Sequence, residues 1–84
     1  METVGLFSFE NSRLAYMAAD ATKDLQTRLI PLLPEIDASC GLALRCPFDA
    51  VEVVKAYLSH EHITWQGVYS YVRRDGKRYV EALV

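Results

Sequence analysis

The order of extended and helical segments is the feature that most limits how this chain can fold. A β-branched and aromatic run at 3–9 predicts a strand. Apolar residues spaced three and four apart then follow, which is typical of an amphipathic helix. The rest of the chain holds short apolar runs at 29–33 and 41–46, a second helical pattern that ends near His60, and extended runs at 63–74 and 77–84. The predicted order is strand, helix, strand, strand, helix, strand, strand.

Both predicted helices have an apolar stripe and a residue suited to cap them. Asn11 or Ser12 can cap the first helix, because a short side-chain oxygen accepts from the free amides of a first turn. Asp49 and Glu52 have the three-residue spacing of a capping box at the start of the second helix. The first stripe consists of Leu14, Met17, Ala18, Ala21 and Leu25, and the second of Val51, Val54, Tyr57 and Leu58.

Two local signals constrain the sheet. Pro31 has no amide hydrogen for a β-ladder, so the run at 29–33 is predicted to lie at a sheet edge. Asp75-Gly76 is typical of a two-residue hairpin turn, which needs a positive φ at both central positions. We therefore expect the last two strands to form a hairpin, over 63–84.

These signals together predict an α+β fold. We expect a ferredoxin-like split βαβ sandwich (β-α-β-β-α-β), with helices on one face of an antiparallel sheet and an extra C-terminal hairpin strand. A chain of 84 residues is enough for one small core, so we expect a single domain over 1–84. Right-handed crossovers should place the first and third strands side by side, and we expect these two strands to be parallel.

Charge and hydropathy exclude several classes of partner. Nine Lys and Arg residues against 11 Asp and Glu residues give a net charge of −2, which offers little attraction to nucleic acid or anionic lipid. No apolar run approaches the ~18 residues of a membrane span, and the start lacks the basic residues of a signal peptide. We expect a cytoplasmic protein that binds neither nucleic acid nor membranes.

The two cysteines have different predicted settings. Cys40 and Cys46 are six residues apart, and on one strand at ~3.3 Å per residue they would be about 20 Å apart, too far for a disulfide. Cys46 has the strand parity of Leu44, toward the helix-covered face, so we expect a buried thiol. Cys40 follows a polar loop and precedes Gly41, which leaves the neighbouring sulfur open.

His60 and His62 are the candidate partners of this open thiol. The second helix runs back along the third strand, so both histidines should return to the sheet end that holds Cys40. An imidazole there could hold the thiol proton. Alternatively, the histidines simply end the helix, whose C-terminal partial charge disfavours a thiolate. The cysteine spacing lacks a Cys-x2-Cys pair, so neither a metal site nor another cofactor is predicted.

The most distinctive motif is Ser39-Cys40-Gly41, followed by a strand that ends in a base at Arg45. With Leu29-Ile30-Pro31 upstream and Asp49 downstream, the segment over about 6–69 resembles the small bacterial domain family named "putative selenium/sulfur carrier protein-like" (DUF3343).

This resemblance implies a function for Cys40. The cysteine of the motif would take up sulfur or selenium from a donor protein, as a persulfide or selenosulfide, and pass it to an acceptor protein. Ser39 and Gly41 would support it with a hydroxyl and an amide. The chain departs from the family pattern at Leu33-Pro34, where a Pro-Arg pair is frequent, and in its C-terminal hairpin.

A second class of function is open on the residues alone. The chain could be a non-catalytic regulatory or interaction module in which Cys40 is incidental. Aromatic residues of shared strand parity, on an open sheet face, would favour a homodimer through that face over RNA binding, given the net charge. These residues are Phe7 and Phe9 on one strand, and Trp65, Tyr69 and Tyr71 on another.

The basic segment Arg73–Arg78 carries a net charge of +3 at the predicted hairpin tip. It could dock an acidic partner or an anion, or it could simply keep an edge hairpin soluble. No acid–base pair or phosphate-binding loop is evident, so we expect a thiol carrier or a binding module rather than a turnover enzyme.

Overall fold

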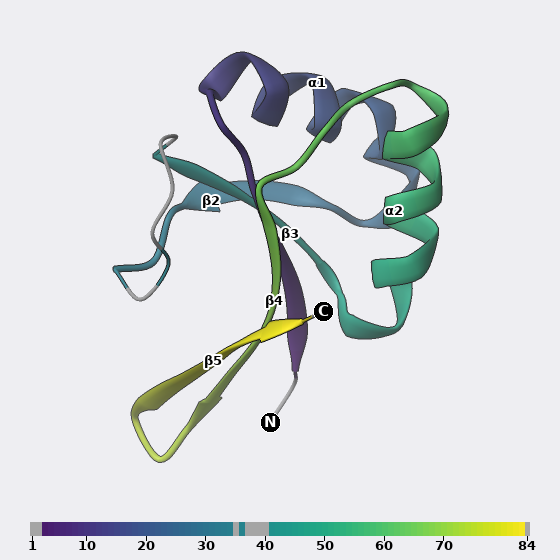
Figure 1. Cartoon of the computed structure of the whole chain (residues 1–84). Helices are drawn as coiled ribbons and strands as arrows, with labels where there is room; N and C mark the ends of the chain where they lie inside the picture. The colour runs from purple at the N-terminus through teal and green to yellow at the C-terminus, as the bar shows by residue number, and fades with distance from the viewer. Residues whose placement is uncertain (1–2, 35, 37–40, 84) are drawn as a thin grey trace.

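The protein folds as a five-stranded antiparallel sheet with two helices on one face (Figure 1). The structure is a computed structural model and describes residues 3–34, 36 and 41–83. Its strands are β1 (Val4–Ser8), β2 (Arg28–Pro31), β3 (Leu42–Pro47), β4 (Gly67–Arg74) and β5 (Lys77–Leu83), and its helices are α1 (Ser12–Ala21) and α2 (Val51–His60). This architecture confirms the predicted α+β, ferredoxin-like split βαβ fold with an extra strand.

The sheet order is β2-β3-β1-β4-β5. β1 and β3 are neighbours as predicted, but the expectation that they run parallel is wrong. Val4 lies opposite Pro47 and Ser8 lies opposite Ala43, which is an antiparallel register. β3 is also antiparallel to β2, so β1 and β2 share a direction with β3 inserted between them. The crossover rule therefore applies to β1 and β2, which α1 connects, and not to β1 and β3.

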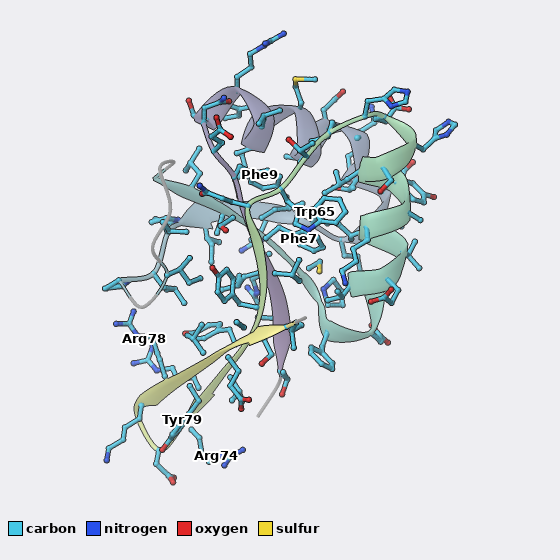
Figure 2. The ribbon with its side chains drawn as sticks, in the orientation of Figure 1. Phe7, Phe9, Trp65, Arg74, Arg78 and Tyr79 are labelled. Atoms are coloured by element: carbon cyan, nitrogen blue, oxygen red, sulfur yellow. The ribbon has the colours of Figure 1, made fainter. Side chains whose placement is uncertain are left out.

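The core fills the space between the sheet and the helices. Phe7 and Phe9 are fully buried there, and the ring of Trp65 meets Phe7 edge to face with the centroids 5.6 Å apart (Figure 2). The prediction that these aromatic residues lie together on an open sheet face is wrong. Phe7 and Phe9 face the helices in the core, and Trp65 lies ahead of β4, where the strand parity of Tyr69 and Tyr71 does not apply. Around these rings pack Ala15, Ala18, Leu44, Cys46, Val51, Val54, Leu58, Ile63 and Val68.

The helices begin in different ways. Asn11 caps α1 as predicted, because its side-chain oxygen accepts from the Leu14 amide at 2.9 Å. The predicted capping box of α2 is wrong. Asp49 lies within a single 3-10 turn over Phe48–Ala50, and α2 starts after that turn with no side-chain cap.

The buried stripes are narrower than the sequence predicts. Met17 and Tyr57 are 39% and 42% exposed, so neither belongs to the core. Leu25 lies outside α1, in a separate 3-10 turn over Lys23–Leu25. Small residues of α1 make its close contact with the sheet, and Ala15 and Ala18 are fully buried.

The predicted sheet-edge strand and the predicted hairpin are both confirmed. β2, which contains Pro31, is one edge strand, and β5 is the other. Asp75 and Gly76 have φ angles of 53° and 76°, the pair of positive values that a tight hairpin turn needs. The β4–β5 hairpin extends away from the helix layer (Figure 1). Among the described residues, no helix has the length and apolar character required to cross a membrane.

Candidate functional site

The site predicted from sequence centres on the motif Ser39-Cys40-Gly41. Ser39 and Cys40 lie outside the described residues, so their predicted roles stay predictions. Gly41 is described: it is exposed, directly precedes β3, and its carbonyl accepts a hydrogen bond from the Leu32 amide at 3.0 Å. Among the described residues, a Cβ atom built on Gly41 would meet no heavy atom within 4 Å beyond its chain neighbours. The motif therefore joins β3 at a position that is anchored through its backbone and open at its side.

The two histidines lie at the C-terminal end of α2. His60 is the last helical residue, and both His60 and His62 are exposed. His62 has a φ of 59° and donates its amide to the carbonyl of Ser59, while the Ile63 amide donates to the carbonyl of Leu58. These bonds close the helix end, which is the ordinary structural role of such residues.

The structure does not bring the histidines to Gly41. Neither imidazole has an atom within 4 Å of a Cβ position on Gly41. In Figure 1 the start of β3 and the end of α2 lie on opposite sides of the molecule. The predicted proximity of the histidines to Cys40 itself concerns a residue outside the described part of the chain.

Cys46 is a buried thiol, as predicted. It is 1% exposed and faces the core, near Gly5 and Val51. The pKa of the Cys46 thiol is raised to about 11, mainly by burial; a hydrogen bond with the Gly5 backbone lowers this pKa, and the charge of Asp49 adds to the rise. The thiol is therefore protonated at neutral pH, and it is neither a nucleophile nor a metal ligand there.

Metal ligands do not gather in the part of the chain that the structure describes. No three His, Cys, Asp or Glu side chains among these residues are grouped so that they could hold a metal ion. His62 instead borders a shallow, mostly apolar hollow of about 470 Å³, together with Ser59, Ile63, Thr64 and Trp65.

Sequence reasoning missed a groove on the sheet face that points away from the helices. It has a volume of about 300 Å³ and is lined by Val4, Ile30, Arg45, Tyr71 and Arg73. These residues come from four strands, so only the register between strands brings them together. The available signal was that Tyr71 and Arg73 have the strand parity opposite to that of Val68, the buried residue of β4.

The motif Ser39-Cys40-Gly41 thus leads into the third strand of a small α+β domain, and Gly41 is exposed at that point. The family described as "Putative Se/S carrier protein-like" matches residues 5–70, and the chain belongs to this family. The match runs from β1 into β4 and includes both helices and Ser39-Cys40-Gly41, whereas the hairpin turn and β5 follow it. Comparisons with curated proteins and with solved structures give no match.

Proposed function

We propose that this protein carries sulfur or selenium on Cys40 and passes it to a partner protein. The observation that carries the proposal is that the chain belongs to the carrier-like family. The family match covers residues 5–70, a range that contains the whole motif Ser39-Cys40-Gly41. The donor and the acceptor are both proteins in this proposal, and the chain itself completes no catalytic cycle. The chemistry suits a reducing compartment such as the cytoplasm, where thiols persist.

The transfer needs no external oxidant or reductant. The Cys40 thiolate attacks the outer sulfur of a donor persulfide, so a new S–S bond forms on Cys40 as the donor S–S bond breaks. The donor sulfur leaves as a thiolate and takes up a proton, equivalent to the proton that Cys40 lost. An acceptor nucleophile later attacks the same outer sulfur and releases the Cys40 thiolate. A donor perselenide reacts in the same way and leaves a selenosulfide on Cys40.

Two features of the described structure support this role. Gly41 is exposed and has free space at its side, so a partner can approach the chain next to Cys40. Cys46 is buried and protonated at neutral pH, so it does not compete for the cargo or displace it to form a disulfide. We propose supporting roles for Ser39 and the Gly41 amide and none for His60 and His62, which are exposed at the end of α2.

Loading of the purified, reduced protein tests the proposal. The chain is incubated with a cysteine desulfurase and cysteine, or with a selenocysteine lyase and selenocysteine, and its intact mass is measured. We expect a gain of one sulfur or one selenium atom in the wild type and in Cys46→Ser, and no gain in Cys40→Ser. The absence of any adduct, or equal adducts on both cysteines, would contradict the carrier proposal.

The second candidate is a non-catalytic interaction module in which Cys40 is incidental. The arginine-lined groove on the sheet favours it, because the described residues that line this groove include no cysteine and no histidine. Alkylation of the native protein separates the two candidates. Fast, pH-dependent labelling of Cys40 supports the carrier, whereas labelling at the rate of a simple free thiol supports the module.

A further inference from the structure

The sheet face opposite the helices, here called the open face, collects arginines. Leu6 alternates with core-facing Phe7 along β1, and its partner Arg45 therefore lies on the open face. The same register places four arginines there, as two directly opposed cross-strand pairs, Arg28 with Arg45 and Arg73 with Arg78. No acidic residue of the described strands has this parity.

Two adjoining hollows mark the open face. One hollow runs from β2 to β4 across β3 and β1, and it is lined by Val4, Ile30 and Tyr71 together with Arg45 and Arg73. A second hollow of about 280 Å³ shares Val4 and Arg45 with it. The second hollow is completed by Gln26, Arg28 and Pro47, and it also borders Cys46, whose side chain faces the core. We call the two hollows together the arginine groove.

The charges of the arginine groove are not neutralised within the described part of the chain. Arg28, Arg45 and Arg73 have no ion pair with any described residue, and Arg45 is half-buried. Like charges directly opposite each other on neighbouring strands are unfavourable, and partial burial removes some of the water that would screen them. An anion placed between these arginines would relieve the repulsion.

We propose that the arginine groove binds an acidic segment of a partner protein. Carboxylates of the segment pair with Arg28, Arg45 and Arg73, and its apolar side chains cover the half-buried Ile30 and Tyr71. Arginine suits this contact because its planar fork can hold a carboxylate through two parallel hydrogen bonds. This inference does not rest on the carrier chemistry, since it is argued only from Arg28, Arg45 and Arg73 and from the apolar residues between them.

The charge distribution of the chain favours an acidic protein segment over nucleic acid, a second copy of the chain or a small anion. With four arginines on the open face and a net charge of −2, the remainder of the chain carries −6, which repels a long polyanion such as nucleic acid. A second copy docked by the same face would oppose arginines to arginines. A small inorganic anion would leave Ile30 and Tyr71 uncovered. A short segment with both carboxylates and apolar side chains satisfies the whole groove.

The test uses a soluble, blocked peptide of about ten residues that combines glutamate with valine, labelled with a fluorophore. Its affinity is measured by anisotropy for the wild type, for the double variant Arg45→Gln/Arg73→Gln, and for Arg13→Gln, an exposed arginine of α1. We expect the double variant to bind about tenfold more weakly and Arg13→Gln to bind within about twofold of the wild type. Backbone amide shifts on titration should map to β1–β4, and the free spectra confirm that each variant is folded.

Each other outcome overturns the assignment. An equal loss in Arg13→Gln would mean that attraction to the peptide is general rather than local. Binding of a matched glutamine–valine peptide with the same affinity would remove the role of charge. Tighter binding of an oligonucleotide of equal length at the same strands would assign the groove to nucleic acid. Shifts on the open face that depend only on protein concentration would assign it to a second copy.

Discussion

Gly5 lies on β1 below the start of α2, and its missing side chain is what allows this close approach. A Cβ atom there would collide with the Val51 side chain and lie 3.0 Å from the sulfur of Cys46. We expect Gly5→Ala to lower the free energy of unfolding by about 1–3 kcal/mol, because the fully packed core must shift to admit it. Urea denaturation of the two proteins measures the difference.

Gly41→Ala is the matched control for that substitution. In the part of the chain that the structure describes, no heavy atom beyond the chain neighbours lies within 4 Å of its Cβ position, and no positive φ of the kind that disfavours other residues is found at Gly41. The free energy of unfolding should change by less than about 0.5 kcal/mol. An equal loss at both positions would show that packing against Val51 and Cys46 is not the cause.

Cys46 should make stability fall in alkaline solution. Its pKa rises from 9.0 to about 11 on folding, so above pH 9 the unfolded chain loses a proton that the folded chain retains. The stabilising contribution is complete below pH 9 and is lost as the pH rises through 11. Compared with Cys46→Ala, the wild type should lose roughly 2–3 kcal/mol of unfolding free energy between pH 8 and 11.

Denaturation of both proteins across this pH range gives that difference, in which the titrations of tyrosine and lysine residues cancel. A constant difference would mean that the thiol keeps its ordinary pKa in the folded protein. The buried position of Cys46 was predictable, because strand parity alone places it beside Leu44 on the core side. The contribution of Asp49 to its pKa was not, because the 3-10 turn that positions this carboxylate has no clear sequence signal.

At the scale of single elements, we expect substitutions at the starts of the two helices to differ in their effect on stability. Asn11→Ala should destabilise the protein by about 1 kcal/mol, because the Leu14 amide loses the oxygen that it donates to. Asp49→Ala should cost less, because Asp49 makes no capping bond to α2. Thermal unfolding of both variants measures this difference in stability. A larger loss of stability for Asp49→Ala than for Asn11→Ala would support the capping box predicted from sequence.

The elements were predictable to different extents for physical reasons. The hairpin turn follows from Asp75-Gly76 alone, since few other pairs accept a positive φ at both positions. The direction of β1 relative to β3 does not follow from local pattern, because an apolar strand pairs in either direction. The direction depends on the strand that α1 connects to β1. That strand is β2, which runs parallel to β1, and β3 lies between β1 and β2 in the sheet.

At the scale of the molecule, the sheet separates two kinds of surface. The helix side holds the core and the buried Cys46, whereas the opposite side holds the arginine groove. The family match ends at residue 70, so the Arg73 side of that groove lies beyond the shared part of the chain. The periodicity of the sequence predicted the two layers. The groove could not be predicted in this way, because its residues come together only through the register of four strands.

This charge distribution governs self-association. The homodimer through the sheet face, expected from sequence, would bring the arginines of two copies together, so it should be weak at low salt and strengthen as salt screens them. Sedimentation velocity at low and at about 1 M salt measures this, where the screening length is roughly 3 Å. Arg45→Ser/Arg73→Ser should associate more strongly than the wild type at low salt, while Arg13→Ser should not. A tight dimer at low salt that these changes leave intact would place the interface on another surface.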